Sequence, residues 1–185
     1  MTRRRKIVLF GLLPLGSFLL ALIIIGLVGF VQGPRNKLGE KTVSILQGAT
    51  QVETFRLVDG PYDDYAKAGT TSDEIIDYPV HSQGQVFGRK FAANLAHAVL
   101  DPRTYAAMND NTCEINPDVA FRAWRGRECV EVILCYHCHQ MLVTTKDAQG
   151  HMTHSAYTEF YLNKPAFLAL AKEVFPGDKE IQSLQ

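Results

Sequence analysis

The feature that most constrains this chain is a long apolar segment close to its N-terminus. From Ile7 to Val31 the sequence has no charged residue, and Ser17 carries the only hydroxyl group. A helix of this length rises by about 37 Å, at roughly 1.5 Å per residue, whereas the hydrocarbon core of a bilayer is about 30 Å thick. Backbone polar groups must satisfy one another in lipid, so residues 7–32 are predicted to form a transmembrane helix.

The length of this segment also separates an uncleaved anchor from a secretory signal that is removed. The apolar part of a signal peptide has about 7–15 residues and precedes small residues at a cleavage site. This segment is longer and ends in Gly-Phe-Val-Gln-Gly. The basic cluster Arg3 to Lys6 directly precedes it, so residues 1–6 are predicted to be cytoplasmic and the C-terminal part extracytoplasmic.

The rest of the chain has the length of one domain. Residues 33–42 are polar and include Pro34 and Gly39, which favours a linker, and residues 43–185 are predicted to form the domain. Of the 19 Lys and Arg residues four precede the apolar segment, which leaves 15 against 19 Asp and Glu, a net charge of −4. This charge argues against nucleic acid as a partner.

Residue patterns predict one strand and one helix in the first half of the domain. Apolar and polar residues alternate over 51–57, which indicates a strand, and residues 43–46 suggest a short strand or turn. The polar stretch 62–85 is typical of a long surface excursion. Apolar residues four apart predict an amphipathic helix over 89–100.

The second half predicts an antiparallel meander followed by a helix. Residues 118–124, 128–135 and 140–145 read as three strands, with Val130, Val132 and Leu134 on one face of the second. Asn163 is expected to cap a helix that Pro176 ends. The predicted fold class is α+β: an N-terminal transmembrane helix, then one small domain with an antiparallel β meander and flanking helices.

Four cysteines lie close together in the sequence: Cys113, Cys129, Cys135 and Cys138. Outside the cytoplasm disulfides are the default, and four cysteines allow three pairings. A Cys135–Cys138 bridge would close a very short loop and be redox-labile, as a thiol–disulfide oxidoreductase requires. Pairing Cys113 with Cys129, or either with the turn pair, would instead staple the meander.

The run Cys135-Tyr-His-Cys138-His139 also matches the attachment pattern of a c-type haem. In that pattern two thioethers hold the porphyrin and the adjacent histidine ligates the iron, which would make the chain an electron-transfer protein. The strand-like residues before the run are unusual for such a motif, which generally opens a helix. The candidates for a second axial ligand are Met141, Met152, His151 and His154.

A third interpretation of the cysteines is a metal site. A Cys-x-x-Cys turn between strands resembles one knuckle of a zinc ribbon, and Cys113, Cys135 and Cys138 with a histidine could bind zinc. The spacing of Cys113 and Cys129 does not supply a second knuckle. The cofactor therefore stays open between none, zinc and haem c. With no catalytic motif elsewhere, the domain is expected to be a binding or structural module, with a possible protein partner.

Several stretches resemble a group of uncharacterised bacterial exported proteins. They are the sequences at 100–105, 113–122, 130–138 and 167–181. The resemblance implies export and this fold class but no activity. Cys113, Cys135 and Cys138 match the pattern of the group, whereas Cys129 is extra. In that group the residue after the second turn cysteine is often not histidine, which weakens the haem interpretation of His139.

Overall fold

The computed structural model describes residue 20 and residues 33–57, 74–75, 78–105 and 115–185. The chain divides into two compact units, Met1–Gly33 and Pro34–Gln185. The predicted transmembrane segment, residues 7–32, lies outside the described residues apart from Leu20. Within the described part of the chain, no helix is both long and apolar enough to cross a membrane.

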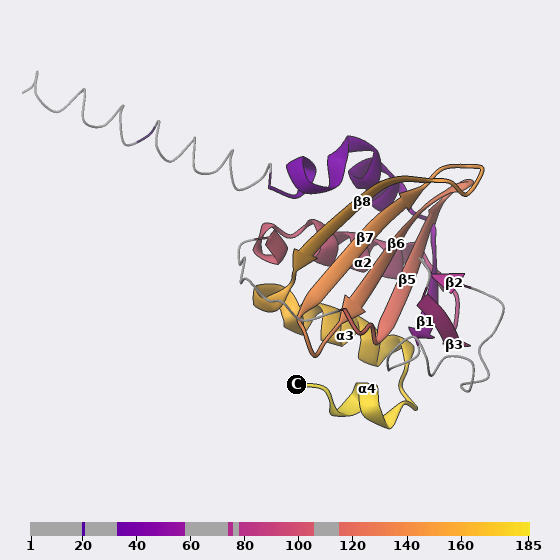
Figure 1. Cartoon of the computed structure of the whole chain (residues 1–185), viewed down its shortest axis with the longest axis vertical. Coiled ribbons are helices and arrows are strands. Elements are labelled where there is room, and N and C mark those ends of the chain that lie inside the picture. Colours follow the sequence, from indigo (N-terminus) through magenta and orange to yellow (C-terminus); the bar gives the residue numbers. More distant parts are fainter. Residues whose placement is uncertain (1–19, 21–32, 58–73, 76–77, 106–114) are drawn as a thin grey trace, which may run out of the picture. The chain divides into compact units, whose positions relative to one another are not determined.

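The second unit is an α+β domain built on one antiparallel sheet (Figure 1). The order of the strands is β2-β3-β1-β5-β6-β7-β8, and β4 pairs with β1 off this path. The strands are β1 (Gln51–Leu57), β2 (Glu74–Ile75), β3 (Tyr78–Gln83), β4 (Phe87–Gly88), β5 (Val119–Arg125), β6 (Glu128–Cys135), β7 (Gln140–Lys146) and β8 (Met152–Glu159). The predicted meander is therefore confirmed as β5, β6 and β7.

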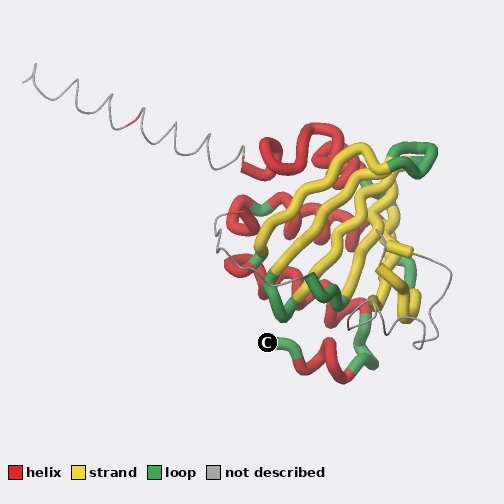
Figure 2. The backbone as a smooth tube through the Cα atoms, viewed as in Figure 1, coloured by secondary structure: helices red, strands yellow, loops and turns green. Residues whose placement is uncertain are grey.

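Helices α2 and α3 lie together on one side of the sheet (Figures 1 and 2). Both contribute apolar side chains to the main core, such as Leu95 from α2 and Phe167 from α3. The helices are α2 (Arg89–Leu100), α3 (Lys164–Val174) and the short C-terminal α4 (Lys179–Ser183), with 3-10 turns at η2 (Pro102–Tyr105) and η3 (Tyr161–Asn163). The predicted helix over 89–100 and the predicted strand over 51–57 are both confirmed.

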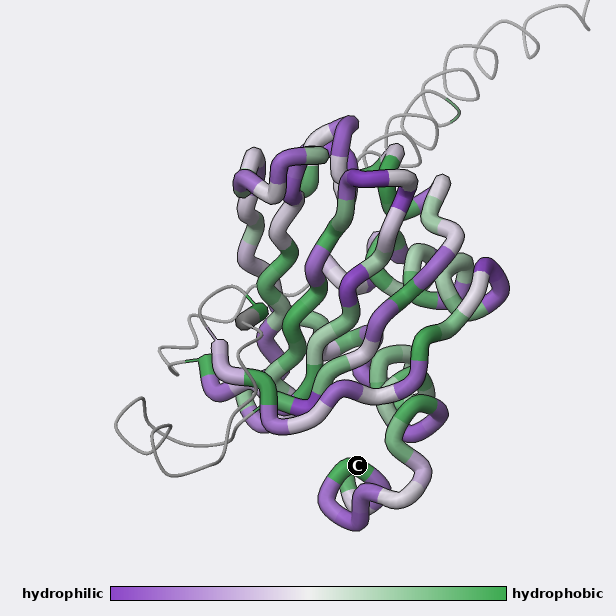
Figure 3. The backbone as a smooth tube through the Cα atoms, turned by 90° about the vertical axis from the view of Figure 1, so that its right-hand side faces the viewer, coloured by the Kyte–Doolittle hydropathy of each residue, from purple (hydrophilic) through white to green (hydrophobic). Residues whose placement is uncertain are grey.

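The alternation in β6 directs its side chains to two different cores, as the sequence predicted. Val130, Val132 and Leu134 pack with the helices, whereas Ile133 joins a smaller cluster with Phe55 of β1 on the other face. Figure 3 shows apolar stretches within the strands and mostly polar turns between them. The sheet is thus buried on both faces at β6.

A polar row crosses the second face of the sheet. Glu53 of β1 pairs with Arg122 of β5, and Arg122 pairs in turn with Glu131 of β6. The Glu131 side chain is fully buried, and its Oε1 receives Arg122 Nη2 at 2.7 Å and Lys146 Nζ at 2.9 Å. A buried carboxylate needs such partners, because an unpaired buried charge is strongly destabilising.

The segment before β1 is helical over residues 33–48, in place of the predicted linker at its start and the short strand or turn after it. Leu38, Thr42 and Leu46 of this segment are buried. After Gly39, the four-residue spacing of Thr42 and Leu46 places them on one face of the helix. Gly39 interrupts the helix with a φ of 75°, a backbone conformation that glycine adopts readily.

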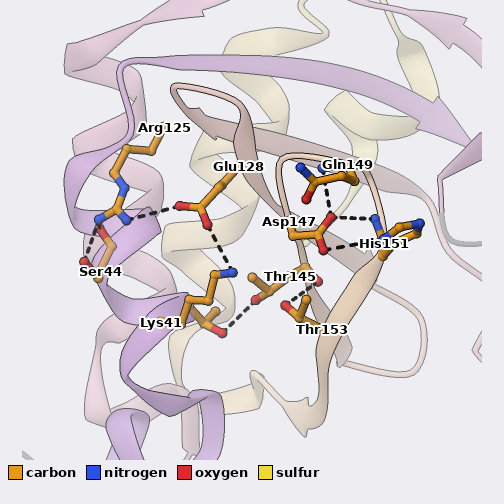
Figure 4. A network of polar contacts seen from close by, with 10 residues as sticks. Lys41, Ser44, Arg125, Glu128, Thr145, Asp147, Gln149, His151 and Thr153 are labelled. Atoms are coloured by element: carbon orange, nitrogen blue, oxygen red, sulfur yellow. Dashed lines mark hydrogen bonds and ion pairs between the residues drawn. The ribbon is translucent and has the colours of Figure 1, made fainter.

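Polar contacts tie this helical segment to one end of the sheet (Figure 4). Lys41 Nζ lies 3.0 Å from Glu128 Oε1 at the start of β6. Arg125 Nη1 donates to the backbone oxygen of Ser44 at 2.9 Å. The helical segment, which includes Lys41 of the predicted linker, therefore contacts the end of the sheet opposite the β6–β7 turn.

Three further expectations differ from the structure. The second half of the expected surface excursion, 62–85, contains β2 and β3, while residues 58–73 lie outside the described residues. Strand β8 was not predicted. Asn163 occupies the predicted N-cap position of α3, but its side chain makes no capping hydrogen bond; its Nδ2 donates instead to Ala98 O and Thr104 Oγ1, each at 2.9 Å.

Candidate functional site

The Cys-x-x-Cys-His run forms the turn between β6 and β7. Cys135, the last residue of β6, pairs with Gln140, the first residue of β7, which leaves residues 136–139 as a tight connection. The backbone N–H of Cys138 donates to Cys135 Sγ at 3.3 Å, closing the turn on itself. The sequence correctly placed this run at a turn between strands.

Tyr136 anchors the turn in the core of the domain. Its side chain is buried and packs edge-on against Phe160, with the ring centroids 5.6 Å apart. Its hydroxyl donates to Phe167 O in α3 at 2.8 Å, and its backbone N–H donates to Asp118 Oδ2 at 2.6 Å. The turn is thus attached both to helix α3 and to the residue that precedes β5.

The cysteines of the turn differ in chemical state. Cys138 is disulfide-bonded, whereas Cys135 and Cys129 are free and buried. Cys135 and Cys138 are therefore not joined to each other. Burial raises the pKa of the Cys135 thiol, although backbone N–H groups directed at the sulfur oppose the shift. A buried protonated thiol is a poor nucleophile.

This arrangement does not fit a covalently attached haem. Attachment consumes both thiols of the motif, but the Cys138 sulfur is in a disulfide and the Cys135 side chain has no exposed surface. Of the candidate second ligands, Met141 is buried in the main core and His151 lies in the β7–β8 turn, beside Asp147.

A zinc site at these residues also lacks ligands in the described part of the chain. No group of three or more His, Cys, Asp and Glu side chains there is arranged to hold a metal. Cys113, which completes the predicted metal set with Cys135 and Cys138, lies outside the described residues. The thiolate is the form of cysteine that binds metal, so Cys138 does not act as a ligand while its sulfur is in a disulfide.

His139 ends the turn in an unusual backbone conformation. Its φ is 56°, and it is the only residue other than glycine with a positive φ among those that the structure describes. Its imidazole Nε2 lies 2.9 Å from Lys164 Nζ at the start of α3. The ring also stands edge-on to Tyr161, with the centroids 5.0 Å apart. The imidazole is thus fixed in place by α3 and η3.

Burial is the largest of the effects that lower the pKa of His139. The positive charge of Lys164 and the neighbouring His137 lower it further, whereas the carboxylate of Glu159 opposes the shift. The imidazole is therefore neutral near pH 7. Because a lysine ammonium can only donate, it donates to Nε2, and the ring proton of His139 resides on Nδ1.

A pocket of about 470 Å³ opens beside the turn. Small-molecule sites typically occupy about 300–1,000 Å³, so this pocket is large enough for a small ligand. We call it the turn pocket. Its walls include Asn116, Asp118, His137, His139, Lys164 and Glu180.

Arg56 fixes the wall that is formed by the C-terminal residues. Its guanidinium binds Asp178 Oδ2 at 3.1 Å and Glu180 Oε2 at 2.5 Å, which holds α4 against β1. It also donates to Asp118 O at 2.8 Å. Asp178 caps α4 by accepting from the backbone N–H groups of Glu180 and Ile181. One buried arginine therefore connects two walls of the turn pocket.

Sequence reasoning identified the turn but missed the residues around it. Asp118, Lys164 and Arg56 come from segments far apart in the sequence, and none belongs to a recognisable motif. The only signal was position: Asp118 is the first residue of a predicted strand and Lys164 opens a predicted helix. Only the sheet register and the packing of α3 bring them to the turn.

Comparison with protein-family models, with curated proteins and with solved structures found no match for this chain. The resemblance to bacterial exported proteins therefore stays a prediction.

Proposed function

We propose that this chain is a membrane-anchored extracytoplasmic binding module, which holds its ligand in the turn pocket. Residues 7–32 would span the membrane, and the basic residues 3–6 would remain in the cytoplasm. The α+β domain would then face an oxidising compartment. A disulfide at Cys138 is consistent with that location, because disulfides are rare in the cytosol.

The observation that carries this proposal is the state of the β6–β7 turn. One sulfur is in a disulfide and the other is buried, while Tyr136 binds the turn to α3. The turn therefore acts as a fixed wall of a pocket rather than as a centre of sulfur chemistry. This supports a binding module over an electron carrier or a thiol–disulfide oxidoreductase, both of which need the two sulfurs together.

We further infer that Cys138 is joined to Cys113. The chain has four cysteines, and Cys129 and Cys135 are free, so Cys113 is the one that remains. This bridge would staple the residues that precede β5 to the turn. A disulfide that closes a loop of about 25 residues stabilises by about 3.5 kcal/mol in the chain-entropy model.

The membrane topology can be tested with reporter fusions to the full chain. Alkaline phosphatase fused after Gln185 should be active, because it folds only outside the cytoplasm, whereas a fluorescent protein that folds only inside should stay dark. The same fusions on a chain without residues 3–6 control for the orienting charges. A bright cytoplasmic reporter with inactive phosphatase would refute the proposed topology.

A further inference from the structure

One wall of the turn pocket carries a positive charge, Lys164, beside two histidines that can donate hydrogen bonds. Lys164 Nζ contacts His139 Nε2, and His137 lies exposed on the same turn. We propose that this wall binds a carboxylate group, with Lys164 as its charged partner and the two histidines as neighbouring donors. The proposal deepens the proposed function, because it names the ligand chemistry of the same pocket.

The acidic groups of the pocket are already occupied by donors of the protein. Asp118 Oδ2 accepts the backbone N–H of Tyr136 at 2.6 Å. Glu180 is paired with the guanidinium of Arg56. The guanidinium therefore offsets the charge of Glu180, whereas the backbone N–H hydrogen-bonds to Asp118 without removing its charge.

Lys164 differs from these groups because its partner is uncharged. The described residues give its ammonium one hydrogen-bond partner, the imidazole of His139, and no carboxylate. An ammonium has three N–H donors, so two remain for a ligand. A hydrogen bond between charged groups is about twice as strong as a neutral one. A bound carboxylate would supply the countercharge that the protein does not.

The histidines make the wall specific in its geometry. His139 is held by Lys164 and Tyr161, and its positive φ sets where the ring projects. Its side chain therefore loses little freedom when a ligand binds, which favours affinity. His137 has no hydrogen-bond partner among the described side chains, so both of its ring nitrogens are free to contact a ligand.

Protonation of His139 should be linked to binding. Burial, Lys164 and His137 disfavour the imidazolium, and Glu159 of β8 favours it; a bound carboxylate would favour it further. By linkage, the carboxylate should bind more tightly as the pH falls from neutral toward the lowered pKa of His139. Phosphate at neutral pH carries more charge but would meet the same groups, so its binding must be compared directly.

The test uses the full chain in nanodiscs and calorimetric titration at pH 6 and pH 7.5. The probes are acetate, inorganic phosphate, a blocked tripeptide with a free C-terminal carboxylate, and the same tripeptide as its amide. We expect the free carboxylate to bind, the amide to bind at least tenfold more weakly, and affinity to rise at pH 6. Acetate alone would indicate a small free acid as the natural ligand, whereas the tripeptide alone would indicate a peptide terminus.

Two variants locate the site. Lys164→Gln should lower carboxylate affinity at least tenfold and raise the pKa of His139 in an NMR titration. Lys179→Gln, which removes an exposed lysine of α4 that does not line the pocket, should leave both unchanged. Circular dichroism checks that each variant is folded.

The outcomes separate this inference from the proposed function. Equal binding of amide and acid, with chemical shifts changing at His139, would overturn the carboxylate proposal and retain the turn pocket as a binding site. Tighter binding of phosphate than of any carboxylate would also overturn it. If no probe binds and His139 resonances do not move, the carboxylate proposal fails, and the proposed binding function loses its main support.

Discussion

The hydroxyl of Tyr136 gives the sharpest test of how the turn is held. It donates to Phe167 O at 2.8 Å, and the side chain is buried. Tyr136→Phe removes this bond while preserving the ring and its contact with Phe160. A buried hydrogen bond between uncharged groups contributes about 1–1.5 kcal/mol, so we expect the free energy of unfolding to fall by that amount.

The assay is urea unfolding of the full chain in detergent, monitored by the fluorescence of Trp124, the only tryptophan in the sequence. For a domain of this size the loss corresponds to a melting temperature lower by about 2–6 °C. Tyr157→Phe is the matched control, because Tyr157 is 45% exposed and its change should stay within about 0.5 kcal/mol. Equal stability of the wild type and Tyr136→Phe would refute the reasoning that this hydroxyl fastens the turn to α3.

Three further perturbations follow from buried groups. Arg56→Met should lower the free energy of unfolding by about 2–3 kcal/mol, less than the loss of a fully buried ion pair, because its carboxylate partners reach solvent. Hydrogen exchange of the backbone amides of 179–183 should also accelerate. Unchanged exchange there would contradict the role of Arg56 in holding α4. Glu131→Ala should lower the free energy of unfolding, measured in urea, by about 2 kcal/mol, because Arg122 and Lys146 lose a fully buried partner. Unchanged stability would show that the two cations are as well stabilised by water as by Glu131. Burial raises the pKa of Cys129 from 9.0 to about 11, so its contribution to stability is present below pH 9 and lost as the pH rises toward 11. In a plot of the free energy of unfolding against pH, Cys129→Ser should reduce the slope between pH 9 and pH 11. An unchanged slope would rule out this thiol as the cause.

Local sequence patterns were sufficient to predict the strands and helices whose apolar residues recur with one regular spacing. The alternation in β6 assigned Val130 and Ile133 to opposite faces, and the four-residue spacing in α2 assigned its buried side. Both patterns arise because one face of the element packs against a large apolar core, whichever elements form that core. Such elements can be predicted without knowing their neighbours.

The elements that were not predicted have sequences compatible with more than one secondary structure, and tertiary contacts select the structure that forms. Pro34 and Gly39 are typical helix breakers, yet the segment is helical and buries Thr42 and Leu46, four residues apart, after the interruption at Gly39. Strand β8 is exposed over most of its length, so it shows little apolar patterning and depends on pairing with β7. Its register could not be read from composition.

The chemistry of the site was the least predictable part. The motif Cys135 to His139 was evident, but the same five residues are compatible with haem, zinc or a disulfide until the state of each sulfur is known. Asp178 could be expected to cap a short helix, but not to share Arg56 with Glu180. Such contacts between distant segments decide function and leave no periodic trace in a single sequence.

The central claim is that the β6–β7 turn is a structural wall with one sulfur in a disulfide. A count of free thiols tests it most directly, in protein purified from a host competent in cytochrome c maturation. Alkylation of the unfolded, unreduced chain followed by mass spectrometry should label two cysteines, Cys129 and Cys135, and a peptide map should join Cys138 to Cys113. After reduction all four cysteines should be labelled, and the unreduced protein should show no Soret band. A Soret band with Cys135 and Cys138 both blocked, or a bridge between those two residues, would contradict the account.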